Sequence, residues 1–182
     1  MKNPFRLAVL LLCLAVVAVT PSTSAQPAAA VATAANAETQ TVKIYRTLRD
    51  QDWKAWYYLA AFSPKLKAEL KEKGTTADDF AADVWKGYNS SFKTPEEKKA
   101  TDDIFKSITE IMVGEAVITG QTAVVPTTAK ISAGGKTRTF KGAAHLVDDA
   151  GVWKLDLTFS DDAEKATSQR VSEIFGSPVD GQ

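Results

Sequence analysis

The stretch Phe140-Lys-Gly-Ala-Ala-His-Leu-Val-Asp-Asp-Ala-Gly-Val-Trp-Lys-Leu-Asp-Leu-Thr-Phe159 decides the fold that the sequence predicts. Apolar and polar residues alternate on both sides of Asp148-Asp149-Ala150-Gly151, which has the composition of a four-residue hairpin connection. That connection pairs Val147 with Val152, so Leu146 faces Trp153 on an apolar side of the hairpin. His145 and Lys154 then share the opposite, polar side. This alternation is typical of an antiparallel sheet that is covered on one face only.

Two turns further upstream, Gly134-Gly135 and Gly120-Gln121, extend the same sheet. They place the same alternate residues on the apolar face, so an antiparallel meander is expected from Ala116 to Phe159. Pro126 cannot donate a hydrogen bond to a neighbouring strand, which indicates an edge position or a bulge. The pairs that these turns predict are Ala129 with Phe140 and Ile118 with Ala123.

The residues before the meander recur at helical spacing. The last of these helices is expected to continue through Ile108 and Met112, and the chain turns to strand near Val113. After the sheet, Asp162 can cap a short helix that carries Ile174. Helices, a meander and a short helix make an α+β fold with the helices on one face of a curved sheet. The expected helix starts are Glu38, Asp52, Ser63, Thr76 and Thr94.

The first 25 residues have the pattern of a secretory signal, with a charged start, an apolar centre from Leu7 to Val19 and small residues before the cleavage point at Ala25. The apolar run is too short for a membrane span, so no stable membrane insertion is expected after cleavage. An exported bacterial protein is predicted, either periplasmic or extracellular. The expected divisions are a signal peptide (1–25), a flexible Ala-rich leader (26–37), a single domain (38–175) and a tail (176–182).

Composition excludes several classes of function. The chain of 182 residues has 22 basic and 22 acidic residues, one histidine and one cysteine. Removal of residues 1–25 leaves 20 basic against 22 acidic residues and no cysteine. The mature chain therefore cannot form a disulfide, and it lacks the basic excess of a nucleic-acid-binding protein.

Three segments resemble the nuclear transport factor 2-like superfamily, whose members form a cone from a sheet wrapped around helices. They are Asp50 to Leu59 with the following Ser63-Pro64-Lys-Leu66, then Val117 to Val124, and Asp149 to Asp156. The sequence is similar to exported bacterial proteins of the DUF4878 group, whose function is uncharacterised. The resemblance implies a cone interior that holds a small apolar ligand in many members, and an Asp, His or Tyr there in the enzymes of the superfamily.

Aromatic residues and small inward residues predict a ligand pocket in that cone. Large aromatic side chains more often simply fill a core, where each contributes roughly 1.5–3 kcal/mol when fully buried. Small residues at mid-sheet nevertheless leave a hollow that either helix side chains or a ligand fills. The residues expected to line it are Trp53, Trp56, Tyr57, Trp85, Thr127, Ala144 and Trp153, with Tyr88 in the same aromatic cluster.

No catalytic constellation stands out in the sequence. His145 has the side chain most suited to general acid–base work at neutral pH, but the predicted pairing places it on the solvated face. No metal site is expected, since one histidine and no mature cysteine cannot form a cluster, and no cofactor is indicated. Asp148-Asp149 and Asp161-Asp162 are better explained as turn and cap residues.

These observations favour an exported, non-enzymatic domain that binds a small apolar ligand or a protein partner. One alternative is an enzyme of the isomerase or dehydratase kind, which requires an acid inside the cone with a raised pKa. Another is a structural module that forms a homodimer through the outer face of the sheet, where Val124, Val147 and Val152 lie.

Overall fold

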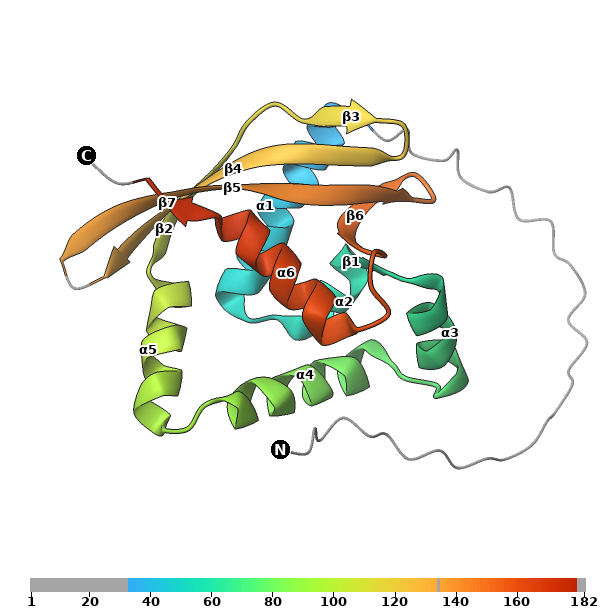
Figure 1. Cartoon of the computed structure of the whole chain (residues 1–182), viewed down its shortest axis with the longest axis horizontal. Coiled ribbons are helices and arrows are strands. Elements are labelled where there is room, and N and C mark those ends of the chain that lie inside the picture. Colours follow the sequence, from blue (N-terminus) through green and yellow to red (C-terminus); the bar gives the residue numbers. More distant parts are fainter. Residues whose placement is uncertain (1–32, 134, 180–182) are drawn as a thin grey trace, which may run out of the picture.

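The structure is a computed structural model that describes residues 33–133 and 135–179 (Figure 1). The signal peptide and most of the expected leader lie outside the described residues. The helices are α1 (Ala34–Asp50), α2 (Trp53–Leu59), α3 (Pro64–Glu72), α4 (Ala77–Ser91), α5 (Pro95–Lys106) and α6 (Ala163–Phe175). The strands are β1 (Ala60–Phe62), β2 (Ile108–Val113), β3 (Val117–Thr119), β4 (Thr122–Ala133), β5 (Lys136–Asp149), β6 (Val152–Leu157) and β7 (Ser177–Pro178).

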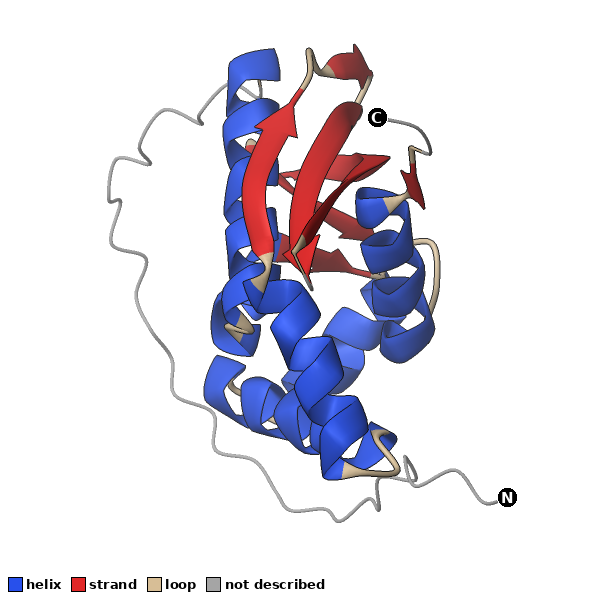
Figure 2. Ribbon diagram, turned by 90° about the vertical axis from the view of Figure 1, so that its left-hand side faces the viewer, coloured by secondary structure: helices blue, strands red, loops and turns tan. Residues whose placement is uncertain are grey.

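The strands form one sheet in the order β1-β6-β5-β4-β2, with β3 also paired to β4 and β7 to β5. All pairs are antiparallel except β1 with β6. Helix α1 contacts β2, β4 and β6, so the sheet curves around it, as the side view in Figure 2 shows. The predicted α+β class, with helices against a curved and mostly antiparallel sheet, is confirmed.

Two of the three predicted turn registers are correct. Ala129 pairs with Phe140 and Ile118 pairs with Ala123. The third is wrong by two residues, because the turn consists of Ala150 and Gly151 alone, at φ 57° and 85°. Two successive residues with positive φ suit the twist of a tight hairpin. The resulting pairs are Asp149 with Val152, Val147 with Lys154 and Leu146 with Leu155.

The prediction of which residues share a face of the sheet is still correct, because a shift of two residues leaves each side chain on the same side of its strand. The alternate residues of the central strands are buried as expected. The buried members of this face are Ala123, Val125, Thr127, Ala129, Ala144, Leu146, Trp153, Leu155 and Leu157.

The segment from Ile108 to Met112 was expected to be helical, and this prediction is wrong. Helix α5 ends at Lys106, and β2 pairs with β4 from Ile108 onward. The strand predicted before Gly120 is therefore two strands, β2 and β3. Residues 114–116 between them belong to neither strand, and the Gly114 amide donates to the Pro126 carbonyl at 2.8 Å. Pro126 itself pairs with Ala143 of β5 in regular register. The irregularity expected from Pro126 is instead the break between β2 and β3, opposite this proline.

Other boundaries also differ from the expected ones. Helix α1 begins at Ala34, four residues before Glu38, and Ala37 is fully buried. Helix α2 ends at Leu59, and Ala60 begins strand β1 directly after it. Part of the expected tail forms β7, which pairs with Phe140 and Lys141 of β5. The predicted final helix is confirmed as α6, with the Asp162 side chain accepting from the Lys165 amide at 3.0 Å.

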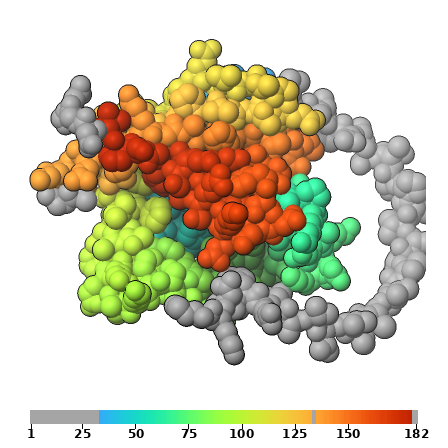
Figure 3. Space-filling model, viewed as in Figure 1, coloured from blue at the N-terminus to red at the C-terminus, as the bar shows by residue number. Residues whose placement is uncertain are grey.

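Helix α6 packs so closely on β5 that only glycine fits at the contact. A Cβ atom on Gly142 would lie 2.2 Å from the Glu173 carbonyl oxygen and 2.4 Å from that of Ile174. Gly176, which follows the helix, would place a Cβ 1.9 Å from the Lys141 carbonyl oxygen. Figure 3 shows α6 lying over the strands on this face. Helix α6 is therefore in direct backbone contact with β5, next to the residues of β5 that pair with β7.

Candidate functional site

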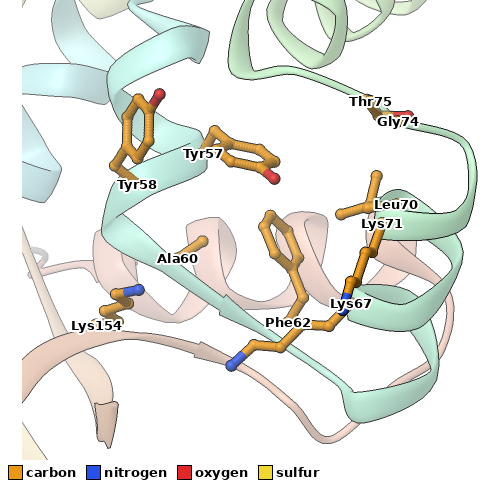
Figure 4. Close-up of a pocket in the computed structure, with 10 residues that line it drawn as sticks. All are labelled: Tyr57, Tyr58, Ala60, Phe62, Lys67, Leu70, Lys71, Gly74, Thr75 and Lys154. Carbon is orange, nitrogen blue, oxygen red and sulfur yellow. The ribbon is translucent and has the colours of Figure 1, made fainter. Parts of the chain in front are cut away.

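A pocket of about 530 Å³ lies at the edge of the sheet, where α2, β1, α3 and β6 meet (Figure 4). We call it the edge pocket. It lies beside β1, which is the edge strand of the sheet next to β6. Its lining residues are Tyr57, Tyr58, Ala60, Phe62, Lys67, Leu70, Lys71, Gly74, Thr75 and Lys154.

The local sequence explains why α2, β1 and α3 follow one another directly beside this pocket. Asp52 starts α2 by accepting a hydrogen bond from the Ala55 amide at 2.9 Å. Ser63 precedes a proline, which disfavours helical backbone and keeps the end of β1 extended. Its hydroxyl accepts from the Leu66 amide at 3.2 Å and thereby caps α3. β1 therefore lies between two helices that start independently, and the three elements leave space between them.

Aromatic rings form the inner wall of the edge pocket. The Tyr57 and Phe62 ring centroids are 5.8 Å apart, and Figure 4 shows the two rings turned toward each other. Phe80 of α4 supports both from behind, at 5.2 Å from Tyr57 and 5.6 Å from Phe62. Phe62 itself is only 5% exposed. The wall is thus fixed by contacts among these three aromatic rings.

Lysine side chains lie around the same pocket. Lys67 and Lys71 stand one helical turn apart on α3, and Lys154 comes from β6. Asp149, at the end of β5, lies 2.8 Å from Lys154 Nζ and 3.3 Å from Lys67 Nζ. The hydrogen bond from Lys154 holds the pKa of the Asp149 carboxyl below its ordinary value, although partial burial opposes this. Asp149 is therefore ionised at neutral pH and bridges two of the three lysines.

The interior of the curved sheet is occupied by the protein itself. Thr127 and Ala144, both predicted to line a ligand pocket there, are 2% and 0% exposed. Thr127 Oγ1 donates to the Ile174 carbonyl at 2.8 Å, and the Tyr45 hydroxyl donates to the same oxygen at 2.6 Å. The end of α6 thus fills the space above the small residues of β4 and β5.

The aromatic residues predicted to form one cage lie in three places. Trp56 and Trp153 belong to the core, where Trp153 Nε1 donates to the Thr33 carbonyl at 2.9 Å. Trp53 and Trp85 line a separate, shallower depression of about 420 Å³ between the α1–α2 junction and α4. Of the seven predicted residues, Tyr57 alone lines the edge pocket.

Tyr88, from the same predicted cluster, belongs to a polar network behind the shallower depression. Its hydroxyl donates to Asp102 at 2.7 Å, and Gln51 donates to the same carboxylate oxygen at 3.0 Å. Lys98 lies over the Trp85 ring at 5.1 Å and forms an ion pair with Asp102. The hydrogen bonds from Gln51, Lys98 and Tyr88 hold the Asp102 pKa well below its ordinary value. These contacts fasten α5 to α4 and to the junction between α1 and α2.

His145 lies on the outer face of the sheet, as the sequence predicts, and its side chain is 38% exposed. Its Nε2 is 3.9 Å from the Glu173 carboxylate, which also forms an ion pair with Arg170. Burial would raise the Glu173 pKa, but hydrogen bonds from Gln169 and Arg170 outweigh it and lower the pKa. Among the described residues, no group of three or more His, Cys, Asp and Glu side chains could hold a metal ion.

The sequence did not reveal most of the edge pocket. Phe62 and Lys154 come together only because β1 pairs in parallel with β6, which links residues about ninety positions apart. The local signal that could have been used is on α3, where Leu66 and Leu70 alternate with Lys67 and Lys71. That pattern indicates a helix face with apolar side chains beside cations.

No protein-family model matches the sequence, and a search of curated proteins returned no match. One similar solved structure is from Jannaschia sp. CCS1 and is described as SnoaL-like polyketide cyclase by similarity. The two sequences are 13% identical, and the match covers 78% of this chain and 96% of that one with a TM-score of 0.29. A likeness this loose carries no argument about function.

Proposed function

We propose that this chain is an exported domain that binds a small, largely apolar molecule in the edge pocket. The observation that carries the proposal is a pocket of about 530 Å³ with a fixed aromatic wall. Ligand pockets for small molecules are typically about 300–1,000 Å³ and are lined by aromatic and apolar side chains with a few polar groups. Tyr57, Phe62 and Leu70 supply the apolar contacts here.

Export is part of the proposal and is supported by the signal-like residues 1–25 and by the resemblance to the exported DUF4878 group. In the part of the chain that the structure describes, no helix has the length and apolarity needed to span a bilayer. Expression in a bacterium, followed by separation of cytoplasm, periplasm and medium, tests the location. Mass spectrometry of an exported product should give a chain that starts at Gln26, whereas an intact cytoplasmic chain would contradict export.

The isomerase or dehydratase alternative requires a carboxyl group with a raised pKa inside the curved sheet. The buried polar side chains that the structure describes are Gln40, Thr41, Thr47, Ser63, Thr127 and Arg170, and none is a carboxylate. Where a described carboxyl has a clearly shifted pKa, the shift is downward. The geometry therefore favours binding over this chemistry.

Binding is tested with N-phenyl-1-naphthylamine, a neutral probe that fluoresces in apolar surroundings. Thr75 lines the mouth of the edge pocket and is not in a helix or strand, so Thr75→Trp should fill the space without disturbing the core. We expect this variant to weaken probe binding at least about tenfold. Ser168→Trp, on the exposed side of α6, is the matched control and should bind like the unaltered protein. Equal binding by both variants would overturn the proposed site.

Exposed valines on the outer face support a second candidate function, self-association. Val117 and Val124 are opposite each other and are 62% and 37% exposed, while Val152 on the same face is 48% exposed. Sedimentation of the purified protein over a hundredfold concentration range would detect a dimer, and Val124→Lys should then dissociate it. A constant monomer mass would remove this candidate.

A further inference from the structure

The three lysines of the edge pocket differ in their partners. Lys67 and Lys154 share the carboxylate of Asp149, at 3.3 Å and 2.8 Å. Lys71, one helical turn after Lys67, forms no ion pair or side-chain hydrogen bond within the described part of the chain. Its ammonium group is therefore the cation of the pocket that remains free to bind an anion.

The charge around the edge pocket is unbalanced. No Asp or Glu is among its lining residues, which include three lysines, and Asp149 offsets only one of the three positive charges. The lysine side chains that contact Asp149 are themselves partly sheltered, at 48% exposed for Lys67 and 26% for Lys154. Ion pairs in such partly buried positions are screened less by salt than fully exposed ones. An anionic group that enters the pocket thus meets a net positive charge beside the aromatic wall.

Asp149 has a second consequence for an entering anion. Its carboxylate already occupies the space between Lys67 and Lys154, so it competes with any external carboxylate for these two ammonium groups. An external carboxylate can reach Lys71 without this competition, while its apolar body lies against Tyr57 and Phe62. Asp149 then sets how much the other two lysines contribute.

We propose that the edge pocket selects amphipathic anions, molecules with a flat or aliphatic body and one carboxylate, with Lys71 as the primary anion-binding residue and Asp149 as a built-in competitor. This inference rests on the proposed function, because it assigns a ligand class to the same pocket. A charge-assisted hydrogen bond is roughly twice as strong as a neutral one. The carboxylate form of a ligand should therefore bind more tightly than its neutral amide.

The test uses two ligands of nearly the same shape, naphthalene-2-carboxylate and naphthalene-2-carboxamide, in calorimetric titrations at low salt. We expect the carboxylate to bind the unaltered protein about tenfold more tightly than the amide, by the strength of a charge-assisted bond. Lys71→Gln should remove most of this preference, so that the carboxylate and the amide bind with nearly equal affinity. Asp149→Asn should increase the preference about threefold, because it frees two ammonium groups. Lys86→Gln, an exposed lysine on α4 outside the pocket, is the matched control and should change neither ligand.

The outcomes separate the two proposals. If both ligands bind equally and Lys71→Gln has no effect, the anion inference fails while binding of apolar molecules stands. If neither ligand binds and the neutral probe does not bind either, both proposals fail. A weaker carboxylate preference in Asp149→Asn would show that Asp149 helps to position the lysines, which contradicts its role as a competitor.

Discussion

The interior of the curved sheet and the edge pocket are built from similar residues but differ in what fills them. Inside the sheet, Thr127 and Tyr45 both donate to the Ile174 carbonyl, so the end of α6 is held where a ligand would otherwise lie. At the edge, Tyr57 and Phe62 form the wall of a pocket that the described residues leave unfilled. Small and aromatic residues therefore indicate a pocket only where no other part of the chain can reach them.

The largest expected effect comes from disturbing the filled interior. Gly142→Ala would place a Cβ 2.2 Å from the Glu173 carbonyl oxygen, and this is a backbone atom of α6 that cannot move aside as the end of a side chain can. We expect a loss of about 3 kcal/mol in the free energy of unfolding, at the upper end for overpacked sites, measured by urea denaturation. Gly74→Ala is the control, since Gly74 has φ 61° but open space around it, and should cost only about 1 kcal/mol. Equal losses would show that α6 is not seated on β5.

A smaller loss should follow from weakening the hydrogen bonds at the Ile174 carbonyl. Tyr45→Phe removes one of two buried donors, and we expect a loss of about 1–1.5 kcal/mol at pH 7. The double variant with Thr127→Val leaves this carbonyl without either side-chain donor and should lose more than the sum of the single variants. Additive losses would mean that the two hydrogen bonds do not cooperate in closing the interior.

Tyr45 should also make the stability of the fold depend on pH. Burial raises the pKa of Tyr45 from 10.0 to about 12, partly opposed by the neighbouring Thr127 hydroxyl. The folded state therefore keeps this proton more strongly than the unfolded state, so the stabilising contribution is complete below pH 10 and is lost as the pH rises toward 12. At pH 11 the loss amounts to roughly 1.4 kcal/mol. The stability difference between the unaltered protein and Tyr45→Phe should shrink by this amount between pH 8 and pH 11, and a constant difference would contradict it.

The smallest effect is expected at the shallower depression. Trp85 is 41% exposed and stacks on Tyr88 with centroids 5.7 Å apart. Trp85→Ala should cost about 1 kcal/mol of stability, the value of an aromatic pair, and leave probe binding at the edge pocket unchanged. A loss of probe binding in thermal-shift and fluorescence titrations would move the ligand site to the depression that Trp53 and Trp85 line.

Much of the sheet could be predicted, because the side of a strand on which a residue lies depends only on the two-residue period of the strand. The hairpin register was wrong by two residues, yet Leu146, Trp153 and Leu155 remain on the buried side. Helix and strand were harder to distinguish from Ile104 to Met112, where apolar residues satisfy both periods over a short run. Pairing with β4, a tertiary contact, decides for a strand from Ile108 onward.

The site was less predictable because its parts meet only through the fold. Phe62, Lys71 and Lys154 come from a three-residue strand, a helix and the last long hairpin. The parallel pairing of β1 with β6 brings these elements together. A strand of three residues is too short for its sequence to predict that pairing. Tyr57 was recognised as a candidate because its type is common in pockets, but its neighbours in the predicted cage were not its neighbours in space.

The most direct test of the central claim, that ligand space lies at the edge pocket and not inside the sheet, is an NMR titration of the purified protein with naphthalene-2-carboxamide. We predict that the amide signals of Phe62, Lys71 and Thr75 shift with a single saturation curve while those of Thr127 and Ala144 stay in place. Shifts confined to Thr127 and Ala144 would show that the interior opens to admit the ligand, and would contradict this account.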